Sequence, residues 1–132
     1  MYTIQDYGTL LLRLTLGVMF LAHALLKVLV FTVPGTVQFF ESQGFSGVLA
    51  YAVIAAEIGG GALLILGVYT RWVALALMPI LLGALGVHWP NGWVFSAPNG
   101  GWEYPAFLTV ASIVQSLLGD GALALKPSSA KL

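Results

Sequence analysis

The chain has 132 residues, of which 59% are hydrophobic and only 8% are charged, and its mean hydropathy is +0.94. A soluble domain usually carries about 25% charged residues, so this composition excludes an ordinary soluble domain. Five basic residues balance five acidic ones, which gives no basis for nucleic-acid binding, and the absence of cysteine excludes disulfides and thiol chemistry in this polypeptide.

Long apolar stretches fill most of the sequence, at residues 7–31, 46–69, 72–89 and 104–124. About 20 helical residues, each rising about 1.5 Å, cross the hydrocarbon core of a bilayer, so each stretch is long enough to span it. The connections between them leave no room for a soluble module. We therefore expect one domain over residues 1–132, an all-α integral membrane four-helix bundle surrounded by lipid.

The first stretch contains Arg13 and Lys27 and lacks the pattern of a cleaved signal peptide, so we expect a mature membrane helix. At about 100° per residue, its polar groups gather on one stripe, with His23 about 40° from Lys27. Because charge is costly inside a membrane and rarely accidental there, this stripe is expected to face the bundle. The stripe consists of Arg13, Gly17, Phe20, Ala24 and Lys27.

The connection after the first stretch predicts a short segment resting in the membrane interface. Pro34-Gly35 breaks the first helix, and Phe39, Phe40 and Phe45 follow within about ten residues, the length of a short amphipathic piece.

The second stretch carries one acidic residue, Glu57, on the same face as Gly60, Gly61 and Gly67. Small residues allow the backbone of a neighbouring helix to approach closely. Lys27 or His23 is expected to reach Glu57 across this contact, because pairing is the least unfavourable way to keep a charge in lipid.

His88 ends the third stretch, and Glu103 begins the fourth at the same level of the bundle. The loop between them is rich in turn formers and contains Trp93 and Trp102, so it is expected to fold down as a lid. Together these features predict one polar pocket in the outer half of the bundle. Its expected side chains are His23, Lys27, Glu57, His88 and Glu103.

Arg13 lies in the inner half of the bundle, and its expected partners are Asp120 or backbone carbonyls. Arg71 falls in the turn between the second and third stretches, and Lys126 and Lys131 follow the fourth. This distribution of basic residues predicts that both termini are cytoplasmic. We interpret Arg13, Arg71 and Asp120 as structural charges.

Each candidate also has a structural explanation. An ion pair between Lys27 and Glu57 that only fixes helix register is as well supported as a catalytic one. A histidine such as His23 more often makes a satisfied interhelical hydrogen bond than acts as a ligand or base, and Trp93 and Trp102 are first of all interfacial anchors. The histidines and glutamates have the right chemistry for a metal, but no short motif fixes a geometry, so we predict no metal site.

Several motifs, in this order and spacing, resemble the DoxX family of small four-helix membrane proteins over nearly the whole chain. They are RLTLGVMFLAHALLKV at 13–28, AEIGGGALLILGVYTRW at 56–72, HWPNG at 88–92, GGWEYP at 100–105 and GDGALAL at 119–125. The chain departs from the family pattern at Ala24, where many relatives have glycine, and at Asp120, where they have proline.

The resemblance implies a bacterial inner-membrane protein that is associated with redox chemistry. Relatives are associated with thiosulfate:quinone oxidoreductase, with complexes that handle thiol and superoxide stress, and with resistance to quinones and catechols. Carried over by position, the family's polar residues are Arg13, Lys27, Glu57, Arg71, His88 and Glu103.

The leading hypothesis is that the pocket binds a quinone and takes part in its reduction or oxidation. His23 or His88 would exchange protons with it, Lys27 would polarise a carbonyl, and Glu57 would hold Lys27 in place. We expect Trp93 or Trp102 to stack on the quinone ring, with His88 and Glu103 also in the binding site. No motif for a covalently bound cofactor is present, so the electrons would come from a redox partner protein.

Two alternatives remain open. The first alternative is a non-enzymatic scaffold or assembly factor whose buried charges hold its helices together. The second, with less support, is a small transporter. Four helices enclose little volume for transport unless the chain forms a homo-oligomer, and no inverted repeat is visible.

Overall fold

The computed structural model describes residues 1–128, and these residues are predominantly helical, as the sequence predicts. The only strand-like pairing in this range is an isolated bridge between Val68 and Lys126. The α-helices are α1 (Ile4–Leu25), α2 (Val33–Ser42), α3 (Val48–Leu66), α4 (Thr70–Ala76), α5 (Met78–His88) and α6 (Glu103–Leu118), with a π-helical turn at Leu26–Val30 and a 3-10 turn at Trp89–Asn91.

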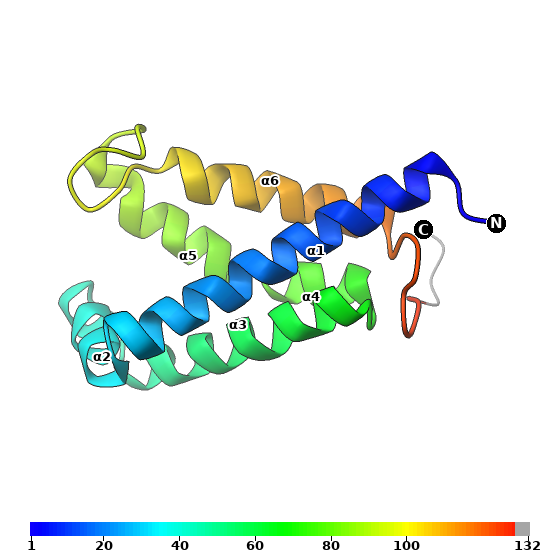
Figure 1. Ribbon diagram of the computed structural model, residues 1–132. Coiled ribbons are helices and arrows are strands. Elements are labelled where there is room, and N and C mark those ends of the chain that lie inside the picture. The colour runs from blue at the N-terminus through cyan, green and yellow to red at the C-terminus, as the bar shows by residue number, and fades with distance from the viewer. Residues whose placement is uncertain (129–132) are drawn as a thin grey trace.

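The long helices lie roughly along one direction (Figure 1). The N-terminus and the segment after α6 lie at one end of the bundle, which we call the terminal end. The short helix α2 and the loop of residues 92–102 lie at the opposite end, which we call the loop end. The predicted short segment between the first two long helices is therefore present as α2.

Helix α1 begins at a capping box. The Asp6 amide donates to the Thr3 hydroxyl at 3.1 Å, and the Thr3 amide donates to the Asp6 carboxylate at 2.8 Å. These bonds satisfy amide groups that have no partner inside the helix, and the negative charge of Asp6 favours the helix N-terminus.

Helices α1 and α3 make the closest contact in the bundle, as the glycines of both helices predict. A Cβ atom added to Gly17 would lie 2.8 Å from the Gly61 carbonyl oxygen, and one added to Gly61 would lie 2.9 Å from the Gly17 carbonyl oxygen. Only a residue without a side chain fits at either position, so backbone packs directly on backbone.

An apolar core fills the middle of the bundle and joins α1, α3, α4, α5 and α6. Because lipid surrounds a membrane protein, most of the other large apolar side chains can remain exposed on the outside. The core consists of Leu16, Phe20, Leu64, Ala74, Leu77, Leu81, Leu108 and Ala111.

The third apolar stretch, predicted as one helix over 72–89, is interrupted. Helix α4 ends at Ala76, Leu77 forms a turn, and α5 begins at Met78. Pro79 explains the interruption, because it has no amide hydrogen to donate to the Leu75 carbonyl and its ring crowds the preceding turn.

The fourth stretch was predicted as a helix over 104–124, but the helix in the structure is shorter. Helix α6 ends at Leu118, and both Gly119 (φ +91°) and Gly121 (φ +74°) adopt backbone conformations that favour glycine. At about 1.5 Å per residue, the 16 residues of α6 are about 24 Å long, short of the roughly 30 Å hydrocarbon core.

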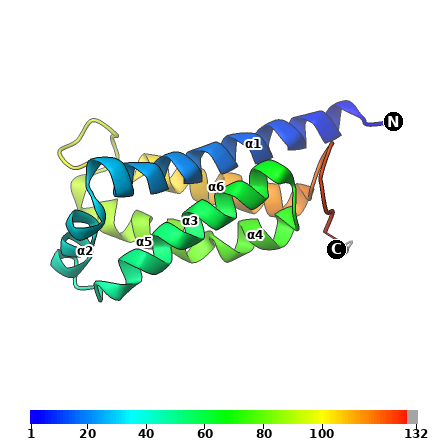
Figure 2. The same cartoon turned by 60° about the horizontal axis from the view of Figure 1, so that its bottom comes forward.

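Three helical segments, rather than the four expected, are therefore long and apolar enough to cross a membrane within the described range. They are Ile4–Val30, Val48–Leu66 and Thr70–Asn91. Residues 119–128, which we call the terminal strap, leave α6 and cross the terminal end of the bundle beside α1 (Figure 2).

Replacement of Gly61 by alanine is expected to destabilise the protein by about 1–3 kcal/mol, because the added methyl group meets the α1 backbone. Thermal unfolding in detergent, followed by circular dichroism, measures the change. Gly59→Ala is the matched control on the same helix, since a Cβ there meets nothing within 4 Å. Equal stability of the two variants would contradict the close contact.

Candidate functional site

A partly buried ion pair joins the π-helical turn to α3 in the half of the bundle nearer the loop end. Lys27 Nζ lies 2.8 Å from Glu57 Oε1 and 3.1 Å from Oε2. The Glu57 side chain is 3% exposed and the Lys27 side chain 19%. This is one of the two pairings that the sequence predicted, and it compensates both charges where lipid or protein would otherwise leave them unsolvated.

The π-helical turn sets the position of Lys27. Within this turn the Phe31 amide donates to the Leu26 carbonyl, five residues back. The Thr36 hydroxyl of α2 donates to the Lys27 carbonyl at 3.0 Å. Thr32, at the start of α2, has φ +66°, an unusual conformation for a β-branched residue. Such π turns and strained residues are frequent at functional sites, and here Lys27 lies within the π turn, five residues before Thr32.

His23 contacts α6 rather than Glu57. Its Nδ1 lies 2.7 Å from the Met19 carbonyl oxygen, and its Nε2 lies 2.7 Å from the Tyr104 hydroxyl. A carbonyl only accepts, so Nδ1 carries the proton toward Met19. In the neutral ring Nε2 is then the acceptor, and the Tyr104 hydroxyl donates to it.

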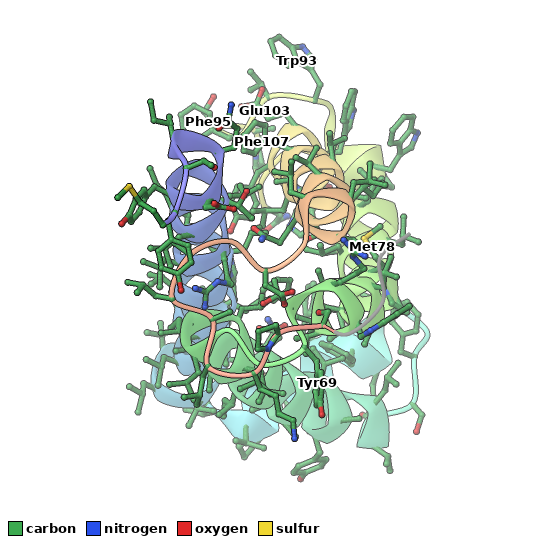
Figure 3. The ribbon with its side chains drawn as sticks, turned by 90° about the vertical axis from the view of Figure 1, so that its right-hand side faces the viewer. Tyr69, Met78, Trp93, Phe95, Glu103 and Phe107 are labelled. Carbon is green, nitrogen blue, oxygen red and sulfur yellow. The ribbon has the colours of Figure 1, made fainter. Side chains whose placement is uncertain are left out.

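Tyr104 also lines an open cleft of about 600 Å³ at the loop end. The lining is mostly apolar, with polar groups from α5 and α6, and Figure 3 shows Phe95, Glu103 and Phe107 close together there. The lining residues are His88, Phe95, Gly100, Gly101, Glu103, Tyr104 and Phe107.

His88 approaches the cleft from the end of α5. Its Nδ1 lies 2.7 Å from the Ala84 carbonyl oxygen, which assigns the proton of the neutral ring to Nδ1 and leaves Nε2 as an acceptor. The loop passes close to this ring at Gly100 (φ +81°), where a Cβ would lie 3.4 Å from His88 Cδ2. The positive φ favours glycine there, while a Cβ would make only an ordinary van der Waals contact with the ring.

The loop tryptophans are not among the residues that line the cleft. Trp102 stacks on Trp89, with ring centroids 4.9 Å apart and an interplanar angle of 25°. Trp93 is 62% exposed and points away from the bundle (Figure 3). Phe95 is the large aromatic side chain that the loop brings to the cleft.

The predicted pocket is therefore arranged as two adjoining groups. Lys27 and Glu57 form an ion pair, while His88 and Glu103 line the cleft. Tyr104 connects the cleft to His23. Tyr104 was not among the pocket residues that the sequence predicted. Its position directly after Glu103 in GGWEYP was the available signal that it reaches the same site.

Arg13 belongs to a separate polar region toward the terminal end. Its side chain is 1% exposed and donates to the carbonyls of Leu64 (3.0 Å), Ile65 (3.0 Å) and Ala122 (2.8 Å). Of the two kinds of partner expected for Arg13, the structure therefore shows the backbone carbonyls.

The other two predicted structural charges also lie at the terminal end. The carboxylate of Asp120 accepts from the Ser128 amide and hydroxyl, each at 2.9 Å. Arg71 Nε donates to the Ser116 carbonyl at 2.8 Å and so ties the start of α4 to the end of α6. Within residues 1–128, no three histidine, aspartate or glutamate side chains are grouped as a metal site requires.

Comparison with known proteins identifies the family. The DoxX family profile matches residues 8–89, well over half of the chain. This chain belongs to the DoxX family. It is 37% identical over 123 residues to a protein of Bacillus subtilis (strain 168) named "Putative oxidoreductase CatD", and the match covers 92% of this chain and 87% of that protein. No solved structure matches it significantly.

The two partners of the ion pair in this DoxX protein are expected to contribute unequally to its stability. Lys27→Met leaves the Glu57 carboxylate buried without its partner and is expected to cost about 3–5 kcal/mol of stability. Glu57→Gln is expected to cost less, because the Lys27 side chain is less buried than that of Glu57 and its long flexible stem can carry the ammonium toward the membrane interface. The double replacement should recover much of the loss. Thermal unfolding of the four proteins forms a double-mutant cycle, and strictly additive losses would show that the two charges do not interact.

Proposed function

We propose that this DoxX-family membrane protein binds a quinone head group in the loop-end cleft and is the membrane subunit through which that quinone is reduced or oxidised. The observation that carries the proposal is the position of Tyr104, which lines the cleft and whose hydroxyl donates to His23 at 2.7 Å. The name of the Bacillus subtilis relative, an oxidoreductase, supports the same class of chemistry.

The cleft has the character of a site for a flat, mostly apolar molecule with a few polar atoms. Its volume of about 600 Å³ falls within the roughly 300–1,000 Å³ of small-molecule sites. Phe95 and Phe107 supply apolar walls, and His88, Glu103 and Tyr104 supply the polar groups that would orient two carbonyl oxygens.

Reduction of a quinone to a quinol consumes two electrons and two protons, and the cleft offers groups that exchange protons. The Tyr104 hydroxyl would donate its proton to one quinone oxygen and regain one from His23, once that ring has been protonated from solvent. His88 or Glu103 would serve the second oxygen in the same way. Lys27 is engaged with Glu57, so we assign the pair an electrostatic role beside the site rather than contact with the quinone.

The electrons in this proposal come from a partner protein, because the chain carries no motif for a covalently bound redox group. We further propose that the protein lies in the bacterial inner membrane with the terminal end facing the cytoplasm. Arg71 is bonded to Ser116 near the end of α6 and Lys126 lies in the terminal strap, which fits the rule that basic residues concentrate on the cytoplasmic side.

Titration of the detergent-solubilised protein with ubiquinone and menaquinone analogues tests the binding step. Saturable quenching of tryptophan fluorescence is expected, because Trp89 and Trp102 stack near the start of α6 beside the cleft. Tyr104→Phe should weaken binding about tenfold, the equivalent of about 1.4 kcal/mol for one lost hydrogen bond.

Tyr7→Phe is the matched control, because Tyr7 is an exposed tyrosine near the start of α1, at the terminal end. It should bind like the wild type. Equal binding by wild type and Tyr104→Phe would remove Tyr104 from the site. Without saturable binding by the wild type, the scaffold hypothesis becomes primary.

A further inference from the structure

We infer that the terminal half of the bundle contains a binding site for ordered internal water, built around Arg13. Four buried side-chain atoms there have no hydrogen-bond partner among the protein atoms of residues 1–128. They are Arg13 Nε, Thr70 Oγ1, Ser112 Oγ and Gln115 Oε1. Their side chains are at most 1% exposed, so bulk solvent does not reach them.

The four atoms come from three helices, α1, α4 and α6, that meet in the terminal half of the bundle. Gln115 Nε2 lies 3.5 Å from the Thr9 carbonyl, which places this part of α6 beside α1. Because α1 and α6 run in opposite directions, Ser112, one turn before Gln115, stands at the level of Arg13, one turn after Thr9.

Thr70 begins α4 in the same half of the bundle. The neighbouring Arg71 donates to the Ser116 carbonyl, so the first turn of α4 lies against the last turn of α6. Arg13 donates to the carbonyls of Leu64 and Ile65, just before the turn that leads into α4.

Other buried hydroxyls in the same bundle donate a hydrogen bond to a carbonyl of their own helix. Thr9 donates to the Gln5 carbonyl at 2.8 Å and Thr109 to the Pro105 carbonyl at 2.7 Å, each one turn back along its own helix. Thr70 and Ser112 do not form such a bond. Buried polar groups without a protein partner are rare in folded proteins, and ordered water is their usual partner.

The chemistry of the four atoms favours water over an anion. Arg13 Nε can only donate, the two hydroxyls can donate or accept, and Gln115 Oε1 can only accept. The orientation of the Gln115 amide is fixed, because its Nε2 donates to the Gly119 carbonyl at 2.9 Å. A small anion would be repelled by Oε1, whereas water satisfies donors and acceptors together.

The terminal strap separates this site from the solvent beyond it. The strap crosses in front of the bundle in the view from the terminal end (Figure 3). It is held there by the bond from Arg13 Nη2 to the Ala122 carbonyl and by the bond from the Ala122 amide to the Asp6 carbonyl at 3.0 Å. On the other side lies the apolar core, which includes Leu16 and Leu108.

Water-edited solid-state NMR of the labelled wild-type protein in lipid bilayers tests the inference directly. Magnetisation from water should reach Arg13 Nε and the Cβ atoms of Thr70 and Ser112 several-fold faster than the Cβ atoms of Thr36 and Thr109. The latter two threonines are also buried but are bonded within the protein, so they are matched controls. Equally slow transfer to all five sites would overturn the inference.

A second test measures whether removal of the hydroxyl groups lowers or raises Tm. If the Thr70 and Ser112 hydroxyls bind water, Thr70→Val and Ser112→Ala should lower Tm, as Thr109→Val does by removing a hydroxyl that is bonded within the protein. If these hydroxyls are simply unpaired, their removal should raise Tm, which would contradict the inference. Exchange of chloride for gluconate should leave the Arg13 Nε resonance unchanged, and a chloride-dependent shift would assign the site to an anion instead.

Discussion

The direct backbone contact between α1 and α3 is the constraint on which the rest of the structure depends. Gly17 and Gly61 let the two helices meet without intervening side chains. This contact brings Arg13 within reach of the α3 carbonyls on one side of the crossing and Lys27 within reach of Glu57 on the other. A wider separation would break both polar interactions at once, because Arg13 would lose its α3 carbonyls and the charges of Lys27 and Glu57 would be left unpaired.

Patterns in the sequence predicted the features that depend on helical periodicity. The stripe from Arg13 to Lys27 faces the bundle, the small residues of α3 form a close contact, and Lys27 pairs with Glu57, because an isolated charge in a membrane has few alternatives. The interruption at Leu77 and the early end of α6 were missed. Both depend on single residues, Pro79 and Gly119, which were read as part of continuous apolar stretches.

The candidate site was harder to predict because it depends on how helices distant in sequence are placed. His88 and Glu103 line the cleft as their common level suggested, but the contact between His23 and Tyr104 joins residues 81 positions apart. The choice of partner for Arg13 shows the same limit. Asp120 was the obvious partner by charge, yet backbone carbonyls at the end of α3 and in the terminal strap form the bonds that the structure shows.

The bond between Arg13 and the terminal strap also has a consequence for biosynthesis. Arg13 and Ala122 are separated by 109 positions, so the arginine leaves the ribosome long before its partner is made. At roughly 5–20 residues per second, this interval lasts about 5–20 s. Throughout that time the Arg13 guanidinium on α1 needs another source of solvation, such as lipid head groups or water. The nascent chain is thus most vulnerable to misinsertion before residues 119–128 have been synthesised.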